Sequence, residues 1–233
     1  MIPILEHLSQ GELEVTGRLV DASNATLYAT CTYQGSSIPV IYKPIAGERP
    51  LWDFPDGNLA QREVAAYFIS ELGEFSVVPP TVMRDGPFGT GMVQQWIDID
   101  DEIDLAEFYR THNEQLRTMA LFDAVVNNTD RKIGHLLPIS SNSVYGCDHG
   151  VTFHEDDKLR TVLWQWADQP LNSDEIEQLV KLEKSVNAKR DELLDLITTN
   201  EFNALLARIN RLLSEGKFPA PSDEWPSVPW PPF

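Results

Sequence analysis

The sequence predicts an α+β protein of two lobes, in which a β-rich N-lobe precedes a helical C-lobe. Short runs of β-branched and aromatic residues, separated by turn-forming residues, fill the first third of the chain. Apolar residues at helical spacing dominate the second half. With 233 residues, the chain is long enough to bury a core and to form two small lobes around a shared cleft.

The N-lobe is predicted to hold an antiparallel meander, one helix and two further strands. The helix begins near Leu59 and stops at Gly73, because its apolar residues recur at helical spacing and a glycine follows them. An irregular, proline-containing loop over residues 47–58 precedes the helix. The predicted strands cover residues 11–20, 25–33, 37–45, 77–85 and 91–99, and a glycine-rich turn at 86–89 joins the last two.

From Asp104 onward the pattern becomes mainly helical. It predicts one short and one longer helix, then a loop followed by a strand, a turn and a strand, and finally amphipathic helices from Ser173 to Leu213. The chain ends in a stretch rich in proline and tryptophan, which is predicted to be extended and to fold back on its own lobe rather than dock on a partner. The predicted parts are 1–97 for the N-lobe, 98–214 for the C-lobe and 215–233 for the tail.

The charge and composition exclude several classes of function. The net charge is -18, from 36 acidic and 18 basic residues, which argues against nucleic acid and against an anionic membrane surface as partners. No apolar run is long enough for membrane insertion, and the first residues lack the basic segment of a signal peptide. Cys31 and Cys147 stand in unrelated contexts, which favours reduced thiols in a cytoplasmic protein.

Lys43 and Glu63 are the first candidate functional residues. Lys43 ends an apolar strand, where alternation points it toward a cleft or the underside of the sheet. Glu63 follows twenty residues later inside the predicted helix, and a strand lysine paired with a helix glutamate is how many kinases hold nucleotide phosphates. The alternatives are that Lys43 is a solvated edge charge and that Glu63 pairs with Arg62 or faces water.

A polar loop over residues 127–135 carries the strongest pattern. It follows a helix and lies between apolar residues, which indicates that it is anchored near the core. Asp130 is followed five positions later by His135, as a carboxylate in a kinase catalytic loop is followed by a metal-binding side chain. A neutral histidine can bind a divalent metal. Alternatively, His135 only caps the loop.

A second carboxylate, Asp148, lies eighteen residues beyond Asp130 in the pattern Asp148-x-Gly150. This position fits the magnesium ligand of a kinase, and Gly150 is expected to permit the tight turn that aims the carboxylate into the cleft. No HExxH, GxSxG, GxGxxG or Walker A pattern is present, so a zinc hydrolase or a serine hydrolase is disfavoured. The turn that contains Ser23 and Asn24 is the candidate phosphate-covering loop, although it holds no glycine.

These residues taken together resemble a known group of proteins. The ordered set of Lys43, Glu63, the Asp130-Arg131 pair and Asp148-x-Gly150 resembles the phosphatidylinositol 3-/4-kinase-like (atypical kinase) superfamily. Three longer segments are similar to an uncharacterised actinobacterial family related to that superfamily, and this second similarity covers nearly the whole chain. The matching segments read KPIAGERPLWDFPDGNLAQREVAAY, VVPPTVMRDGPFGTGMVQQW and NNTDRKIGHLL.

The resemblance implies a compact two-lobed atypical protein-kinase-like fold with a role for each matching residue. Lys43 would contact ATP phosphates while Glu63 holds it, and Asp148 would be the principal metal ligand. Asp130, followed by Arg131, would be the catalytic base or the carboxylate that positions the substrate. The backbone of the hinge would meet adenine; its residues are Gln95, Trp96 and Ile97. His135 replaces the asparagine of the family, which leaves the second metal site and the metal identity open.

The predicted function is that of an ATP-dependent phosphotransferase that uses Mg²⁺ or Mn²⁺. A protein or small-molecule hydroxyl is favoured over a lipid as acceptor, because the chain is short and has no basic patch for a headgroup. Two alternatives remain open: transfer of AMP to a protein by a nucleotide bound in the flipped orientation, and a pseudokinase that only responds to nucleotide.

Overall fold

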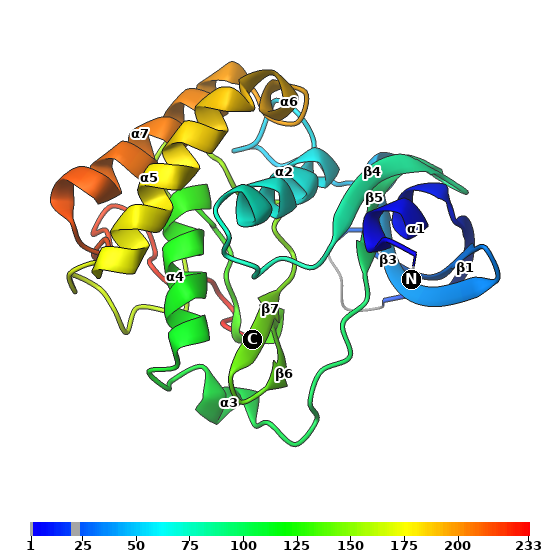
Figure 1. Ribbon diagram of the computed structural model, residues 1–233, viewed down its shortest axis with the longest axis horizontal. Helices are drawn as coiled ribbons and strands as arrows, with labels where there is room; N and C mark the ends of the chain where they lie inside the picture. Colours follow the sequence, from blue (N-terminus) through cyan, green and yellow to red (C-terminus); the bar gives the residue numbers. More distant parts are fainter. Residues whose placement is uncertain (1, 20–23) are drawn as a thin grey trace.

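The computed structural model describes residues 2–19 and 24–233 and confirms the predicted α+β fold, with a sheet lobe and a helical lobe side by side (Figure 1). The N-lobe is built on a five-stranded antiparallel sheet with the strand order β1-β2-β3-β5-β4. Its elements are α1 (Ile4–Gln10), β1 (Glu12–Arg18), β2 (Leu27–Tyr33), β3 (Ser36–Pro44), α2 (Leu59–Leu72), β4 (Thr81–Gly86) and β5 (Gly89–Gln95).

Local sequence signals set the boundaries of these elements. Gln34 and Gly35 have φ values of 48° and 79°, so they form a two-residue turn of the left-handed kind that suits the twist of a β-hairpin. The Asn58 side chain accepts a hydrogen bond of 2.8 Å from the backbone N–H of Gln61 and so caps the start of α2. Helix α2 ends at Gly73, as predicted.

Helix α1 was not predicted from the sequence. It buries His7 and Leu8 against the sheet, and the ring Nε2 of His7 lies 2.9 Å from the carbonyl oxygen of Cys31. Seven residues give too little periodicity to identify a helix, and a helix this short is stable only when tertiary packing supports it. The contact with the sheet, rather than local propensity, therefore explains α1.

The C-lobe combines helices with one β-hairpin. Capping boxes begin α5 at Asn172 and α7 at Thr198. No helix in the described part of the chain combines the length and apolar character that crossing a bilayer requires. The elements are α3 (Leu105–Phe108), α4 (Glu114–Val126), β6 (Leu136–Ser140), β7 (Ser143–Gly146), α5 (Ser173–Ala188), α6 (Arg190–Leu194) and α7 (Thr199–Glu215), with a short 3₁₀ turn at Ile133–His135; a second 3₁₀ turn, Ile45–Gly47, follows β3 in the N-lobe.

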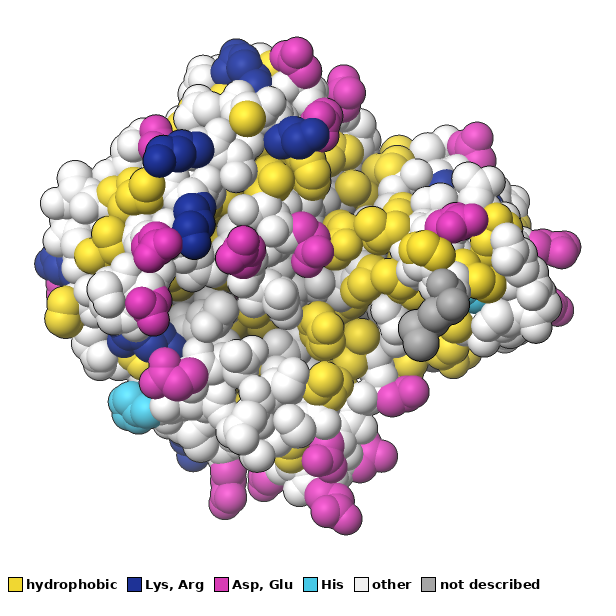
Figure 2. Space-filling view, viewed as in Figure 1, with side chains coloured by type: hydrophobic (Ala, Val, Ile, Leu, Met, Phe, Trp, Pro, Cys, Tyr) yellow, Lys and Arg dark blue, Asp and Glu magenta, His cyan; other side chains and the backbone are white. Residues whose placement is uncertain are grey.

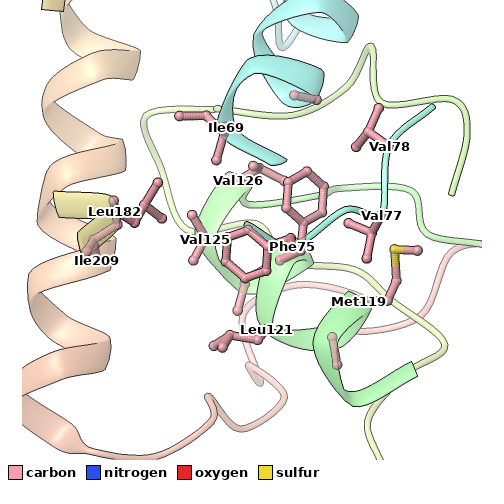
Figure 3. Close-up of a cluster of buried hydrophobic side chains, with 14 of the residues drawn as sticks. Ile69, Phe75, Val77, Val78, Met119, Leu121, Val125, Val126, Leu182 and Ile209 are labelled. Carbon is pink, nitrogen blue, oxygen red and sulfur yellow. The ribbon is translucent and has the colours of Figure 1, made fainter. Parts of the chain in front are cut away.

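The largest hydrophobic core belongs to both lobes through α2 (Figure 3). Ile69 of α2 packs in the same cluster as Phe75, Val125 of α4, Leu182 of α5 and Ile209 of α7, and all five are at most 2% exposed. Helix α2 also packs against β4 and β5 of the N-lobe sheet. Moving α2 would therefore open the core of the helical lobe.

Besides this hydrophobic contact, a buried ion pair connects α2 to the helical lobe. The Arg62 guanidinium lies 2.7 Å from the Glu201 carboxylate at the start of α7, and the two side chains are 3% and 8% exposed. This contact is an alternative to the Arg62–Glu63 pairing considered from the sequence, and it leaves Glu63 free to face the cleft. The Gln61 amide also donates to the carbonyl of Asp195 at 3.0 Å.

The tail crosses the helical lobe and contacts the loops near the cleft. The carbonyl of Pro232 accepts a hydrogen bond of 2.8 Å from the N–H of Ile133, and the carbonyl of Ser227 accepts one of 3.0 Å from the N–H of Thr161. The Lys158 ammonium lies 4.6 Å from the ring centre of Trp225. Figure 1 shows the C-terminus beside the β6–β7 hairpin.

The tail contacts predict a local loss of stability on truncation. In a chain that ends at Ala220, the N–H groups of Ile133 and Thr161 lose their acceptors, so their hydrogen-exchange protection should fall by at least about tenfold. The N–H groups of Thr129 and Phe153 bond within the lobe and should keep their protection. Hydrogen exchange followed by NMR measures all four, and unchanged protection at both tail-bonded amides would contradict the prediction.

Candidate functional site: a cleft between the lobes

Two cavities lie side by side between the lobes. On the face drawn in Figure 2, hydrophobic side chains gather where the two lobes meet. The first, which we name the hinge cavity, has a volume of about 630 Å³ and includes Gln95, Trp96 and Ile97 in its lining. The second, which we name the acidic cavity, has a volume of about 310 Å³ and is lined by five carboxylates: Glu48, Asp53, Glu63, Asp130 and Asp148. Lys43, Asp148 and Thr26 line both cavities.

Lys43 lies at the junction of the two cavities. Strand alternation puts its neighbour Tyr42 in the N-lobe core and Lys43 itself in the cleft. The ammonium is 2.6 Å from the Glu63 carboxylate and 2.5 Å from the Asp148 carboxylate, with the Lys43 side chain only 16% exposed. Burial disfavours the charge of Lys43, but the carboxylates of Asp148 and Glu63 outweigh it and raise its pKa above the ordinary value. Lys43 is thus a fixed cation.

Glu63 connects three elements at once. One oxygen accepts from Lys43 on β3, and the other accepts a hydrogen bond of 2.9 Å from the backbone N–H of His149. The side chain is 2% exposed, and burial raises the pKa of Glu63 while Lys43 opposes that effect. Because α2 carries Glu63, the packing of α2 sets the position of both Lys43 and the segment around Asp148.

Asp148 has an unusual backbone conformation. Its φ is 63°, in the left-handed region that non-glycine residues enter at a cost of about 1 kcal/mol or more. This corrects the expectation for Gly150, which is not among the residues with positive φ; a side chain there would instead meet Leu59, with a Cβ at 3.0 Å. Gly150 therefore permits a close approach to α2, while Asp148 makes the turn. The Lys43 ammonium holds the pKa of Asp148 below its ordinary value.

The loop that carries Asp130 is fixed by side chains just before it. Asn127 ends α4 with a φ of 53°. The Asn128 side chain accepts from the N–H of Asp130 at 3.0 Å, and Thr129 donates to the carbonyl of Val151 at 2.8 Å. Asp130 is 31% exposed and pairs with Lys132 at 3.2 Å, and burial raises its pKa. The loop thus presents one carboxylate to the acidic cavity.

Arg131 lies beneath the site rather than in it. The side chain is fully buried, lines neither cavity and pairs with Asp123 at 2.9 Å. It also contacts His149 Nε2 at 2.6 Å and donates to the carbonyl of Cys147 at 3.2 Å. The residues on both sides of Asp148 are therefore held by Arg131. Arg131, predicted from the sequence alongside Asp130, has the geometry of a positioning residue, not of one that touches substrate.

His135 lies close to Asp148, the other residue predicted to bind metal. His135 Nε2 lies 3.6 Å from the Asp148 carboxylate. Burial lowers the pKa of His135 to about 4, so the ring is neutral near pH 7 and can offer a lone pair. Its Nδ1 is buried and has no hydrogen-bond partner in the described part of the chain. No second group there orients the ring or raises its basicity, as one does for most metal-binding histidines.

The donor set fits a cation held by few protein groups. Among residues 2–19 and 24–233, no three His, Cys, Asp or Glu side chains form a group that could enclose a metal ion. Mg²⁺ usually takes one or two carboxylates, with water and substrate phosphates completing its shell. Asp148 is half-exposed and faces both cavities, so it suits a shared cation of this type.

The hinge residues differ in the backbone groups that they offer. The N–H of Gln95 bonds to Pro80 and that of Trp96 bonds to Pro39, at 2.9 and 3.1 Å. For Ile97, the described backbone hydrogen bonds include none from its N–H. Among the three predicted hinge residues, Ile97 is thus the one whose backbone N–H has no partner within the described part of the chain.

Of the two residues predicted for a phosphate-covering turn, Ser23 lies outside the described residues. Asn24 lines the acidic cavity, and its side-chain oxygen accepts a hydrogen bond of 2.9 Å from the backbone N–H of Arg49. Asn24 therefore braces the loop after β3. The sequence reasoning missed Arg160, which lines the acidic cavity, and the buried partners Asp123 and His149. A charged residue inside the apolar run MALFDAVV was the signal for Asp123.

Comparison with known structures defines the class of fold. No family model matches the sequence. The Golgi casein kinase, in a crystal structure with Mn/ADP bound, aligns with a TM-score of 0.54 and 12% identity over 91% of this chain and 74% of that one. The proinflammatory kinase CtkA of Helicobacter pylori aligns with a TM-score of 0.52 and 12% identity over 89% of this chain and 94% of that one. The fold is thus kinase-like.

The sequence also has a close relative. Protein Rv2133c of Mycobacterium tuberculosis is 38% identical over 262 residues, an alignment that covers 97% of this chain and 94% of the relative. The chain belongs to the same family as Rv2133c.

The buried pair predicts a large effect of a small substitution. Asp123→Asn keeps the shape of the side chain but leaves the Arg131 charge unpaired, so the free energy of unfolding should fall by about 3–5 kcal/mol. Asp157→Asn breaks the exposed ion pair with Arg211 and should cost less than about 1 kcal/mol. Urea denaturation of both variants measures the difference. Equal small losses would show that the buried pair is not a structural constraint.

Proposed function

We propose that this chain is an ATP-dependent phosphotransferase that moves the γ-phosphoryl group to a hydroxyl of a protein or a small molecule. The observation that carries the proposal is the position of Lys43, held between Glu63 and Asp148 where the two cavities meet. Phosphoryl transfer depends mainly on positioning and on neutralising phosphate charge. A fixed ammonium beside a metal-capable carboxylate supplies both.

The hinge cavity suits the base of the nucleotide. Its lining includes the apolar side chains of Ile41, Ile97 and Leu137, and the N–H of Ile97 is available as a donor. From there the triphosphate would extend past Lys43 and Asp148 into the acidic cavity. The Golgi casein kinase with Mn/ADP bound, which shares the fold, supports a nucleotide in this cleft.

Asp148, assisted by His135, would hold Mg²⁺ or Mn²⁺. A divalent cation supplies charge neutralisation for the phosphates when it is bound. The chain's own residues do the positioning: Glu63 would orient the ammonium of Lys43 toward the phosphates, and Arg131 holds the carbonyl of Cys147 and the ring of His149 on either side of Asp148. Asp130 would orient the acceptor hydroxyl and receive its proton.

The acceptor is proposed from charge. The acidic cavity holds five carboxylates, and the whole chain carries -18. Such a surface disfavours an anionic lipid headgroup and favours a neutral or basic acceptor. The finer assignment to the phosphatidylinositol 3-/4-kinase-like superfamily rests on the Asp130-Arg131 and Asp148-x-Gly150 patterns, with His135 in place of the family's asparagine.

The proposal predicts separable effects of two substitutions. Asp130→Asn should lower the transfer rate by about 10²–10⁴-fold with little change in nucleotide affinity, because Asp130 acts on the acceptor. Lys43→Met should weaken ATP binding as well, because its charge faces the phosphates. The measurements are calorimetry with ATP and Mn²⁺, and transfer from ATP labelled at the γ-phosphate.

The same assay distinguishes the alternatives. Label that is transferred from α-labelled ATP instead would indicate AMP transfer. Nucleotide binding without any transfer or ATP hydrolysis would indicate a pseudokinase. If purified chain binds no nucleotide with Mg²⁺ or Mn²⁺, the proposed function is wrong.

A further inference from the structure

Arg160 is a cation in the acidic cavity that the site described above does not use. Its side chain lines the cavity together with Asp130 and Asp148. Within the described residues it forms no ion pair and no side-chain hydrogen bond, and its Nε is buried without a partner. A buried guanidinium nitrogen without a partner costs free energy. The chain has twice as many acidic as basic residues, yet among residues 2–19 and 24–233 none forms an ion pair with Arg160.

The backbone holds Arg160 next to the loop that carries Asp130. The N–H of Arg160 donates to the carbonyl of Asn128 at 2.9 Å, and its carbonyl accepts from the N–H of Arg131 at 3.1 Å. The backbone of Arg160 is thus hydrogen-bonded to Asn128 and Arg131, the two residues that flank Thr129 and Asp130. Burial raises the pKa of Asp130, and the charge of Arg160 is near enough to oppose that rise. The guanidinium therefore has a fixed base although its tip is unbound.

The other cations near the cavity are already committed or lie at its edge. Lys43 contacts two carboxylates, and Lys132 pairs with Asp130. Arg131 is fully buried beneath the site, and Arg49 is exposed at the cavity rim. Arg160 is the cation that combines a fixed base, a position beside Asp130 and an unused set of donors. These properties match a ligand that arrives with negative charge.

We propose that Arg160 binds the phosphoryl group during its transfer. The proposal rests on the proposed phosphotransferase function and names a further catalytic residue for it. The bond between the γ-phosphorus and the oxygen of the leaving ADP breaks, that oxygen keeps the electron pair, and the acceptor oxygen forms the new bond. The acceptor proton passes to Asp130. Arg160 exchanges no atoms, and its planar set of donors binds the oxygens of the group in flight, where charge is spread.

Three variants test this role. Arg160→Gln removes the charge, Arg160→Lys keeps a charge without the planar donors, and Lys184→Gln removes a charge from an exposed position on α5 as the matched control. The first measurement is kcat and KM for ATP, followed as ATP hydrolysis, in which water takes the place of the acceptor hydroxyl. The second is calorimetric binding of ADP with Mg²⁺, with and without aluminium fluoride, which mimics the phosphoryl group in transfer. Thermal melting checks the fold.

The expected result is selective. Arg160→Gln should lower kcat by about 10²–10³-fold and remove the gain in affinity that aluminium fluoride gives to ADP, while ADP alone binds within about threefold of wild type. Arg160→Lys should keep part of the kcat and part of the fluoride-dependent gain in ADP affinity. Lys184→Gln should keep both at the wild-type level. The proposal is overturned if Arg160→Gln keeps kcat within about threefold, or if it weakens ADP alone as much as it lowers kcat. A wild-type chain that neither binds ADP nor transfers phosphate would instead overturn the proposed function itself.

Discussion

The buried pair of Asp123 and Arg131 is the constraint on which the cleft depends. Both side chains are fully buried, 2.9 Å apart, and burying two charges costs several kcal/mol per ion unless hydrogen bonds satisfy the remaining polar atoms. Asn128 and Thr161 contact Asp123, and Arg131 reaches His149 and the carbonyl of Cys147. The loop bearing Asp130 and the segment bearing Asp148 therefore share one network, so the two carboxylates cannot move independently.

The cleft is also fixed from the side of α2. In kinases the position of the corresponding helix decides whether the lysine–glutamate pair forms. Here Ile69 lies in the core of the helical lobe, and Arg62 is paired with Glu201 where both side chains are largely buried. Separating Glu63 from Lys43 by a shift of α2 would require both contacts to break. The structure thus couples the pair to the stability of the whole C-lobe, which leaves less room for regulation by swinging α2.

Sequence reasoning succeeded where local signals decide the structure. The start of α2 near Leu59 and its end at Gly73 are readable within a few residues. It failed where a distant partner decides. Helix α1 needs the sheet, and the positive φ lies at Asp148, whose carboxylate contacts Lys43 and His135, rather than at the glycine two residues later. Arg160 could not be identified from the sequence, because nothing nearby distinguishes a surface arginine from one that a loop turns into a cavity.

The balance of negative and positive side chains in the acidic cavity limits which ligands can bind there. Five carboxylates line the acidic cavity; Lys43 pairs with Glu63 and Asp148, and Lys132 pairs with Asp130. A polyphosphate cannot enter such a cavity unless cations offset the carboxylates, because like charges at short range repel by several kcal/mol where water is excluded. The paired lysines do not offset all five carboxylates. Under the proposed function, a divalent cation on Asp148 and the guanidinium of Arg160 would supply the remaining positive charge that a polyphosphate needs.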